Sequence, residues 1–468
     1  MLSTETLALC SSVVGLTSEI ILTSIKLAVT NTTSAWPPYS PTAAPIFQLS
    51  ADPSIAFYLE EALSLANWGG ANSGEVLRIA TQIIPQDFES VYKAFYYVAE
   101  QTYAFAESVD KTKDPVSARE AYYHAATYYR GADFYLHGNQ SDPRLISLWN
   151  QQTVAFDKAN ALLEIPGERF VVQAHSEDIG DYQAIGVFYA AYPGHGPPIP
   201  TILVGGGYDS SQEEGYHLQC HQILSRGINC VTYEGPGMPT VRRTQNIGFV
   251  TDWWSATLPI VDYLATRPDV DMERLALVGI SFGGILAPLA ASHDDRFSAV
   301  ISIDGWYSAQ QDFEGLFPDE IVQLFNASEA EVFDEVMTSI VNNASYPSNF
   351  RWVIGQGLFA FNTLSPFEWF TRLGKMTVSP EIVANLSMPV FLAKGEDDDE
   401  TGTQPEIAYE KLTTGRPNGV ALTYLHQFNT SLGAGEHCSI GAESQLWAAV
   451  MGWLSPIWGD WAYANVRQ

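Results

Sequence analysis

The chain has few basic side chains for its length. Its 468 residues include 23 Lys and Arg against 53 Asp and Glu, which gives a formal net charge of -30 at pH 7. A surface this negative repels phosphate backbones and anionic membranes. We therefore expect no nucleic-acid partner, and a neutral or weakly charged small molecule as the ligand. A homodimer is compatible with the sequence, but nothing in the composition selects one.

Cysteine is scarce as well. The chain has four cysteines, and their spacing matches no set of metal ligands. A core of this size does not need a disulfide framework. Cys438 follows a histidine of interest, and we interpret it as a small apolar side chain beside that histidine. We expect no bound metal and no cofactor.

Long apolar runs are missing from the N-terminal segment. Leu7–Leu16 is apolar, but no basic residue precedes it, and Glu19 and Lys26 interrupt the residues that follow. This pattern predicts neither a signal peptide nor a membrane span. Six Asn-x-Ser/Thr sequons leave the compartment open, and we expect a soluble protein in the cytoplasm rather than a secreted one.

Nucleotide-binding signatures are absent too, since the sequence has no P-loop and no Gly-x-Gly-x-x-Gly with a following helix and ribose acid. The most informative segment is instead Val278-Gly279-Ile280-Ser281-Phe282-Gly283-Gly284. An apolar strand-like run precedes it and a helix-like run follows it. This is the strand, sharp turn and helix in which a Gly-x-Ser-x-Gly motif exposes a nucleophilic serine. The alternative is an ordinary connection between a strand and a helix.

A nucleophilic serine needs a base and an acid that orients the base. His437, in a glycine-containing loop after the last predicted strand, is the predicted base. Asp398, in the acidic run 396–400, is the predicted acid, because the common pattern at this turn is Gly-x-x-Asp. Asp397 is the second candidate, and Asp304, at the end of the strand after the serine, is the third.

Backbone N–H groups complete such a site by stabilising an oxyanion. We predict the N–H of Phe282 as one donor. The second comes from the loop Gly205–Asp209, where Tyr208 is the first choice and Gly207 the second. Glu234, at the end of another strand, is expected to pair with Arg242 or Arg243 rather than to act in catalysis.

The pattern of apolar residues predicts a mostly parallel, doubly wound α/β sheet with helices on both faces. An apolar stripe (Phe88, Val91, Phe95, Val98 and Phe105) marks a helix in the N-terminal region, and Val420–Tyr424 is the last predicted strand. We predict five segments: a tail and linker at 1–44, a helical cap at 45–166, the first part of the core at 167–309, an aromatic-rich helical lid at 310–385, and the second part of the core at 386–468.

Taken together, these motifs resemble the α/β-hydrolase superfamily. More narrowly, Tyr233-Glu234-Gly235-Pro236-Gly237, the serine turn and Gly435-Glu436-His437-Cys438 resemble a branch with a helical N-terminal region. That branch includes the polyketide chain-shortening hydrolases of fungal naphthalene pigment synthesis and 2,6-dihydroxypseudooxynicotine hydrolase, which cleave a carbon–carbon bond beside a ketone. The likeness runs from about residue 50 to the C-terminus. The acid loop departs from it, because Asp399, Glu400 and Thr403 differ from the residues usual there.

The resemblance implies a serine hydrolase of secondary, polyketide-type metabolism that acts on a small, largely apolar ketone or ester. Both carbon–carbon cleavage and ester or lactone hydrolysis fit this expectation. An acyltransferase or cyclase with the same three residues is the first alternative. A binding protein without catalysis on the same fold is the second.

Overall fold

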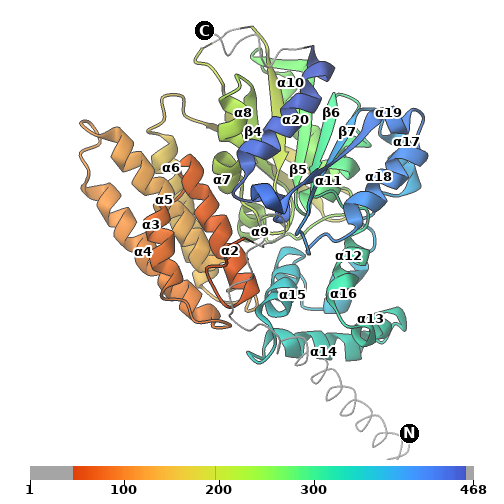
Figure 1. The fold of residues 1–468 in the computed structure, drawn as a ribbon, viewed down its shortest axis with the longest axis horizontal. Coiled ribbons are helices and arrows are strands. Elements are labelled where there is room, and N and C mark those ends of the chain that lie inside the picture. Colours follow the sequence, from red (N-terminus) through yellow and green to blue (C-terminus); the bar gives the residue numbers. More distant parts are fainter. Residues whose placement is uncertain (1–45, 195–196, 460–468) are drawn as a thin grey trace, which may run out of the picture.

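The computed structural model describes residues 46–194 and 197–459. The whole of the predicted tail and linker at 1–44, including Cys10, lies outside these residues. The remaining chain is built around one sheet, with two groups of helices at its side and at one of its ends (Figure 1).

The sheet has eight strands in the order β1-β2-β4-β3-β5-β6-β7-β8. The first two strands pair antiparallel with each other, β2 pairs antiparallel with β4, and all other neighbours are parallel. The strands are β1 (Glu168–Ser176), β2 (Gly180–Tyr189), β3 (Ile199–Gly205), β4 (Asn229–Glu234), β5 (Val270–Ile280), β6 (Ala299–Ile303), β7 (Val390–Gly395) and β8 (Thr423–Phe428). The predicted mostly parallel α/β sheet is confirmed.

Both faces of the sheet are buried. Neighbouring residues on one strand, such as Leu277 and Val278, belong to different apolar cores, because successive side chains of a strand point to opposite faces. The helices that flank the strands are α7 (Gln212–Gly215), a π-helical turn η2 (Tyr216–Cys220), α8 (His221–Leu224), α9 (Pro239–Gln245), α10 (Trp254–Ala265), α11 (Gly283–Ala291), α18 (Gln404–Thr414) and α20 (Glu443–Trp458).

The N-terminal region is helical, as predicted. Its helices are α2 (Pro53–Ser64), α3 (Ser73–Ala80), α4 (Phe88–Ser108), α5 (Pro115–Asp133) and α6 (Arg144–Asn160). Local chemistry sets their starts: the Asp114 side chain accepts from the N–H of Ser117, and Pro115 occupies the first position of α5. The tyrosines of α5 are buried, so they pack the core of this region.

The predicted apolar stripe on α4 is only partly right. Val91 and Phe95 are buried, but Phe105 is 56% exposed. The buried face continues instead through Ala99 and Ala106, whose small side chains allow α5 to approach closely. The large apolar side chains of α4 therefore do not all lie on the face that packs against α5.

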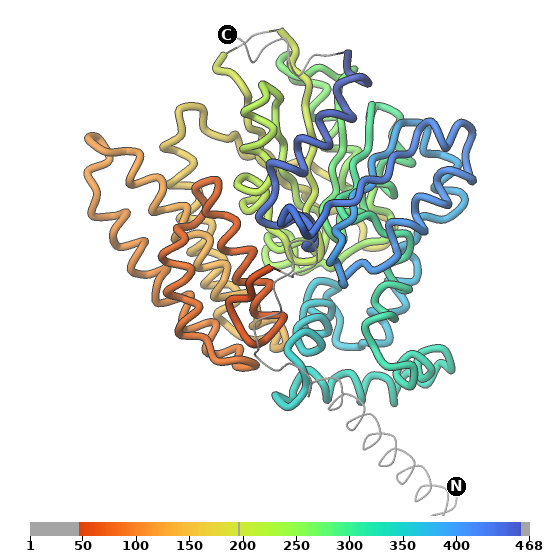
Figure 2. The backbone as a smooth tube through the Cα atoms, viewed as in Figure 1, coloured from red at the N-terminus to blue at the C-terminus, as the bar shows by residue number. Residues whose placement is uncertain are grey.

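A second group of helices lies between β6 and β7. These are α12 (Ala309–Leu316), α13 (Asp319–Asn326), α14 (Ala330–Val341), α15 (Ser348–Ala360), α16 (Pro366–Leu373) and α17 (Pro380–Asn385). Helices α12 to α16 gather below the sheet in Figure 1, whereas α17 lies beside α18, and in Figure 2 the cyan α15 runs beside the red α2. The two helical groups therefore meet near the end of the sheet that holds the carboxyl end of β6.

The last strand begins later than predicted. Gly419–Leu422 forms the short helix α19, and β8 starts at Thr423. Asn418 has a left-handed backbone, and its carbonyl accepts from the N–H groups of Ala421 and Leu422. These bonds hold the segment in a helical turn, and Val420 is 74% exposed rather than part of the sheet.

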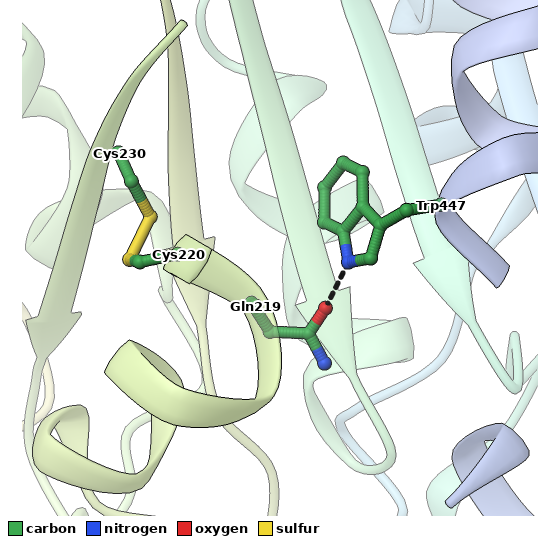
Figure 3. The surroundings of a disulfide bond; sticks show 4 residues. All are labelled: Gln219, Cys220, Cys230 and Trp447. Atoms are coloured by element: carbon green, nitrogen blue, oxygen red, sulfur yellow. Dashed lines mark hydrogen bonds between the residues drawn. A yellow bond between two sulfur atoms is a disulfide. The ribbon is translucent and has the colours of Figure 1, made fainter. Parts of the chain in front are cut away.

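Cys220 and Cys230 form a disulfide, which the spacing of the cysteines did not reveal (Figure 3). Cys220 ends η2 and Cys230 lies in β4, so the packing of this turn against the strand brings the two sulfur atoms together. The composition predicted no disulfide framework, and this single disulfide was not foreseen. Cys438 is free and buried.

None of the helices in the described ranges has the length and apolar character that crossing a membrane requires. The predicted domain limit at 166 falls between α6 and β1, and the limit at 385 coincides with the end of α17. The limit at 309 falls at the first residue of α12. These limits stay predictions.

Candidate active site

The serine turn is built from close backbone contacts. Ser281 lies between β5 and α11 and has a positive φ of 56°. A Cβ on Gly279 would lie 1.8 Å from the carbonyl oxygen of Gly283, and one on Gly283 would lie 2.6 Å from that of Gly206. The backbone can pass through this turn only without side chains at these positions, which leaves the serine hydroxyl projecting from it.

His437 lies directly beside this serine. Its Nε2 is 2.8 Å from the Oγ of Ser281, and its Nδ1 is 3.0 Å from Oδ2 of Asp398. The imidazole is buried, with 6% of the residue exposed. The structure thus joins the predicted serine, histidine and first-choice acid in one chain of hydrogen bonds.

Asp398 is held in place by its own loop. Its carboxylate accepts from the N–H groups of Glu400 and Thr401 and, at 2.6 Å, from the hydroxyl of Thr401. Burial by itself would raise the pKa of Asp398, but the interactions with His437 and Thr401 lower it to about 2. Asp398 is therefore ionised near neutral pH. Asp397, the second candidate, is exposed, and only its backbone N–H bonds toward the His437 loop, at Gly435.

Asp304, the third candidate, contacts the same imidazole. Its Oδ2 lies 3.2 Å from Nδ1 of His437, and it also accepts from the N–H of Cys438. Burial, followed by the negative charge of Asp398, raises the pKa of Asp304 to about 7. Two carboxylates thus face one ring nitrogen, and only Asp398 stays ionised over the whole neutral range.

Further carboxyl groups surround the imidazole. Oε2 of Glu400 lies 3.5 Å from Nε2 of His437, on the serine side of the ring. Burial opposes protonation of His437, yet the interactions with Cys438 and with the carboxylates of Asp398 and Glu400 outweigh it and raise the pKa of His437 well above its usual value. On α12, burial and the charges of Asp398 and Glu400 raise the pKa of Asp312 to about 8.

The loop that carries the predicted second oxyanion donor lies beside the serine. A Cβ on Gly207 would lie 2.8 Å from the Cβ of Ser281, so this loop touches the serine turn. The N–H of Gly207 donates to Oγ of Ser210. Within the described residues, the N–H groups of Tyr208 and Phe282 donate to no protein acceptor. Tyr208 and Phe282 are thus available as donors, whereas Gly207 is engaged.

Aromatic side chains enclose this region. The rings of Tyr208 and Phe282 lie 5.6 Å apart, and Phe313 of α12 lies 5.3 Å from Tyr208. Phe57 of α2 brings the N-terminal helices to the site, with its ring 6.1 Å from that of His437. Nothing in the local sequence marks Phe57 or Asp312 as lying near His437, because only the packing of the two helical groups brings them there.

The predicted pairing of Glu234 with an arginine is wrong. Its carboxylate accepts from the N–H groups of Gln212 and Thr240 at the starts of α7 and α9. Arg242 donates to the carbonyl of Phe359, and Arg243 forms an ion pair with Asp133. Glu234 thus caps two helices, where a carboxylate is favoured by the free N–H groups.

Among the described residues, one group has the donor atoms for a metal: Asp304, His437 and Cys438. Its His437 nitrogen is Nδ1 or Nε2, and both already face Asp398 or Ser281. We therefore assign this group to the serine–histidine site. Two cavities of about 260 and 470 Å³ lie along the N-terminal helices, and neither is lined by Ser281, Asp398 or His437.

Comparison with known proteins decides the family. A family model described as esterase FrsA-like matches residues 92–308. Hydrolase acrC of Aspergillus aculeatus is 30% identical over 331 residues, which cover 68% of this chain and 77% of acrC. The chain belongs to the FrsA-like α/β-hydrolases.

The 20-hydroxy-prefusarin hydrolase FUS2 of Gibberella moniliformis is also 30% identical, over 70% of this chain and 78% of FUS2. The crystal structure of 2,6-dihydroxy-pseudo-oxynicotine hydrolase has a TM-score of 0.60 at 17% identity and covers 84% of this chain and 95% of its own. This structure supports the fold alone. The protein is a hydrolase of the fungal secondary-metabolite type, as the resemblance implied.

Proposed function

We propose that this hydrolase uses Ser281 as its nucleophile, His437 as its general base and Asp398 to orient the imidazole. The observation that carries the proposal is the continuous chain from Oγ of Ser281 through both nitrogens of His437 to Oδ2 of Asp398, with distances of 2.8 and 3.0 Å. These are distances over which a proton transfers directly.

In the first step, Oγ of Ser281 attacks the substrate carbonyl carbon and its proton moves to Nε2 of His437. The N–H groups of Phe282 and Tyr208 donate to the resulting oxyanion, which stabilises it by roughly 3–4 kcal/mol per donor. Collapse breaks the bond to the leaving group and gives an acyl-enzyme, and the proton on Nε2 of His437 passes to the leaving group or, where that group departs as a stable anion, to solvent. The neutral imidazole then deprotonates a water molecule that attacks the acyl carbonyl, and this proton returns to Oγ of Ser281 as the acid leaves.

The substrate we propose is a small, largely apolar ketone or ester. The rings of Tyr208, Phe282 and Phe313 support an apolar and aromatic pocket wall. The relatives acrC and FUS2 are both described as hydrolases, and the substrate named for FUS2, 20-hydroxy-prefusarin, supports a small-molecule substrate here.

Carbon–carbon cleavage needs an acid for the leaving carbanion, and Asp312 of α12, which lies within electrostatic range of Asp398, Glu400 and His437, is the acid we propose. Because its pKa is raised to about 8, this carboxyl group keeps its proton near neutral pH. A carbanion that leaves from a β-diketone needs a proton, and Asp312 can donate one and regain it from solvent. A p-nitrophenolate leaving group needs no such proton, so Asp312→Asn should slow β-diketone cleavage far more than p-nitrophenyl ester hydrolysis.

The test is a substrate panel of aryl β-diketones, p-nitrophenyl esters and lactones, together with a fluorophosphonate probe. We expect Ser281→Ala to keep the fold and to lose both turnover, by about 10⁶-fold in kcat, and labelling. Equal activity of Ser281→Ala and the wild type would reject the proposal.

An acyltransferase or cyclase would use the same residues but exclude water from the second step. Turnover in oxygen-18 water separates the outcomes: label in the acid product means hydrolysis, and its absence means transfer or cyclisation. A binding protein without catalysis would show no labelling at Ser281.

A further inference from the structure

The loop that follows β3 is held by side chains from both helical groups outside the sheet. Gln356 of α15 donates from Nε2 to the carbonyl of Tyr208 at 2.9 Å. Arg130 of α5 donates from Nη2 to the carbonyl of Asp209 at 2.8 Å. Two consecutive carbonyls are thus fixed by two residues far apart in the sequence.

Gln356 reaches the loop from a fully packed position. Only 3% of the residue is exposed, and a carbonyl can only accept a hydrogen bond, so the amide nitrogen must face Tyr208. A second bond joins the same helix to the same residue, since the Tyr208 hydroxyl donates to the carbonyl of Val353. Both ends of Tyr208 are therefore tied to α15.

Arg130 reaches the loop from the opposite helical group. It is 2% exposed, and its Nε lies 3.3 Å from Oε1 of Glu214. Glu214 in turn caps α7 together with Ser211. The protein acceptors around this guanidinium thus lie in residues 209–214, the segment that leads out of the loop. A planar guanidinium presents its donors to two such acceptors in a fixed fork, whereas an ammonium group acts as a compact point charge without that geometry.

These contacts bear on the Tyr208 N–H. The loop touches the serine turn at Gly207, where a Cβ would lie 3.2 Å from Oγ of Ser281. Beyond the end of β3, Gly206 and Gly207 carry no side chain that would restrict the backbone before Tyr208. An oxyanion donor is effective only when its direction is fixed before the charge forms. The hydrogen bonds that Gln356 and Arg130 make to this loop are the contacts that can fix the direction of the Tyr208 N–H.

We propose that Gln356 and Arg130 are positioning residues for the oxyanion hole. They fix the two peptide planes that follow Tyr208 and, together with the bond from its hydroxyl to Val353, place its Cα, which limits how far the Tyr208 N–H can turn away from the developing oxyanion. This inference rests on the proposed function. It also gives the two helical groups a role in the chemical step, because each provides one of the two restraints.

The experiment measures kcat and KM for a p-nitrophenyl ester in Gln356→Leu and Arg130→Met, with Tm measured alongside. We expect kcat to fall by about 10- to 100-fold, which is no more than the loss caused by removing one oxyanion donor outright. KM should change by less than about threefold. Fluorophosphonate labelling of Ser281 should slow in parallel, because that reaction also develops negative charge on oxygen.

Matched controls separate this role from stability. Gln219 is equally buried and accepts one bond from Trp447, and Arg416 donates to the carbonyls of Leu386 and Met388. Gln219→Leu (Figure 3) and Arg416→Met should lower Tm by a similar amount and keep kcat. If either test variant fails to fold, Gln356→Asn or Arg130→Lys replaces it, since each keeps polarity but withdraws a bond.

Unchanged kcat in folded variants of Gln356 and Arg130 would overturn the inference. So would a loss of kcat that the control variants reproduce at equal loss of Tm. Neither result affects the proposed nucleophile, whose failure would appear separately as activity in Ser281→Ala.

Discussion

The serine side and the acid side of the candidate site meet at one edge of the sheet, but different contacts hold them. On the serine side, residues 279–284, backbone atoms pack so closely that a methyl group has no space at Gly279 or Gly283. On the acid side, Asp304, Asp398 and Glu400 all lie within 3.5 Å of a His437 nitrogen.

This difference teaches that the two sides tolerate change differently. A single backbone path fixes the serine, so nothing nearby can replace it or absorb an added atom. The acid side has more than one carboxylate near Nδ1, so removal of one leaves another within contact distance. The predictions below test this contrast, beginning with the largest effect.

Gly279→Ala should abolish activity. The added Cβ would lie 1.8 Å from a backbone oxygen, which cannot move without displacing the start of α11. We also expect a loss of about 3 kcal/mol or more in the free energy of unfolding. Denaturant unfolding and ester hydrolysis measure the two effects. Gly452→Ala is the control, because a Cβ there meets no atom within 4 Å and alanine favours a helix.

Asp398→Asn should lower kcat by about 10²-fold. Loss of the orienting acid costs about 10⁴-fold in serine proteases, and we expect a smaller loss here because Asp304 also contacts Nδ1 of His437. In the double variant Asp304→Asn/Asp398→Asn, kcat should fall by the full factor of about 10⁴. Exposed Asp397→Asn is the control and should keep wild-type kcat. A 10⁴-fold loss in the single variant would show that Asp304 gives no support.

Asp304→Asn alone should have a smaller effect, about fivefold or less on kcat, because Asp398 still holds the imidazole. The oxygen of the introduced amide can still accept from the N–H of Cys438 and face Nδ1 of His437, so the fold should persist. Steady-state kinetics and Tm measure both. A larger loss than in Asp398→Asn would reverse the assignment of the orienting acid.

Glu400→Gln should move the acidic limb of the kcat/KM profile to lower pH. The base must be neutral to act, so activity falls as the pH drops through the raised pKa of His437. Removing the Glu400 charge lowers that pKa. Because the Glu400 side chain is 49% exposed, we expect a shift of about half a pH unit, which salt reduces.

Asp399→Asn, a charge change at the exposed neighbouring position, is the matched control for this measurement. It should leave the acidic limb in place. An equal shift in both variants would mean that the net charge of the loop, rather than the position of Glu400 beside Nε2, sets the pKa.

The sequence by itself determined the order of strands and helices, and with it the serine turn and the loop of His437. Those features depend on local rules: alternating burial in strands, and glycines where the backbone leaves no space. The same rules failed for Phe105 and for the start of β8, where neighbouring helices and an Asn418 turn decide the outcome.

Only the tertiary structure decided what surrounds the serine. It brings Phe57 against His437, sets Asp304 and Asp398 at one ring nitrogen, pairs Cys220 with Cys230, and ties the Tyr208 loop to Arg130 and Gln356. Each of these contacts joins residues from different elements, and no repeating pattern in the sequence indicates that those elements meet. Their distances follow from how the helical groups pack against the sheet, and a linear pattern of residue types does not encode that geometry.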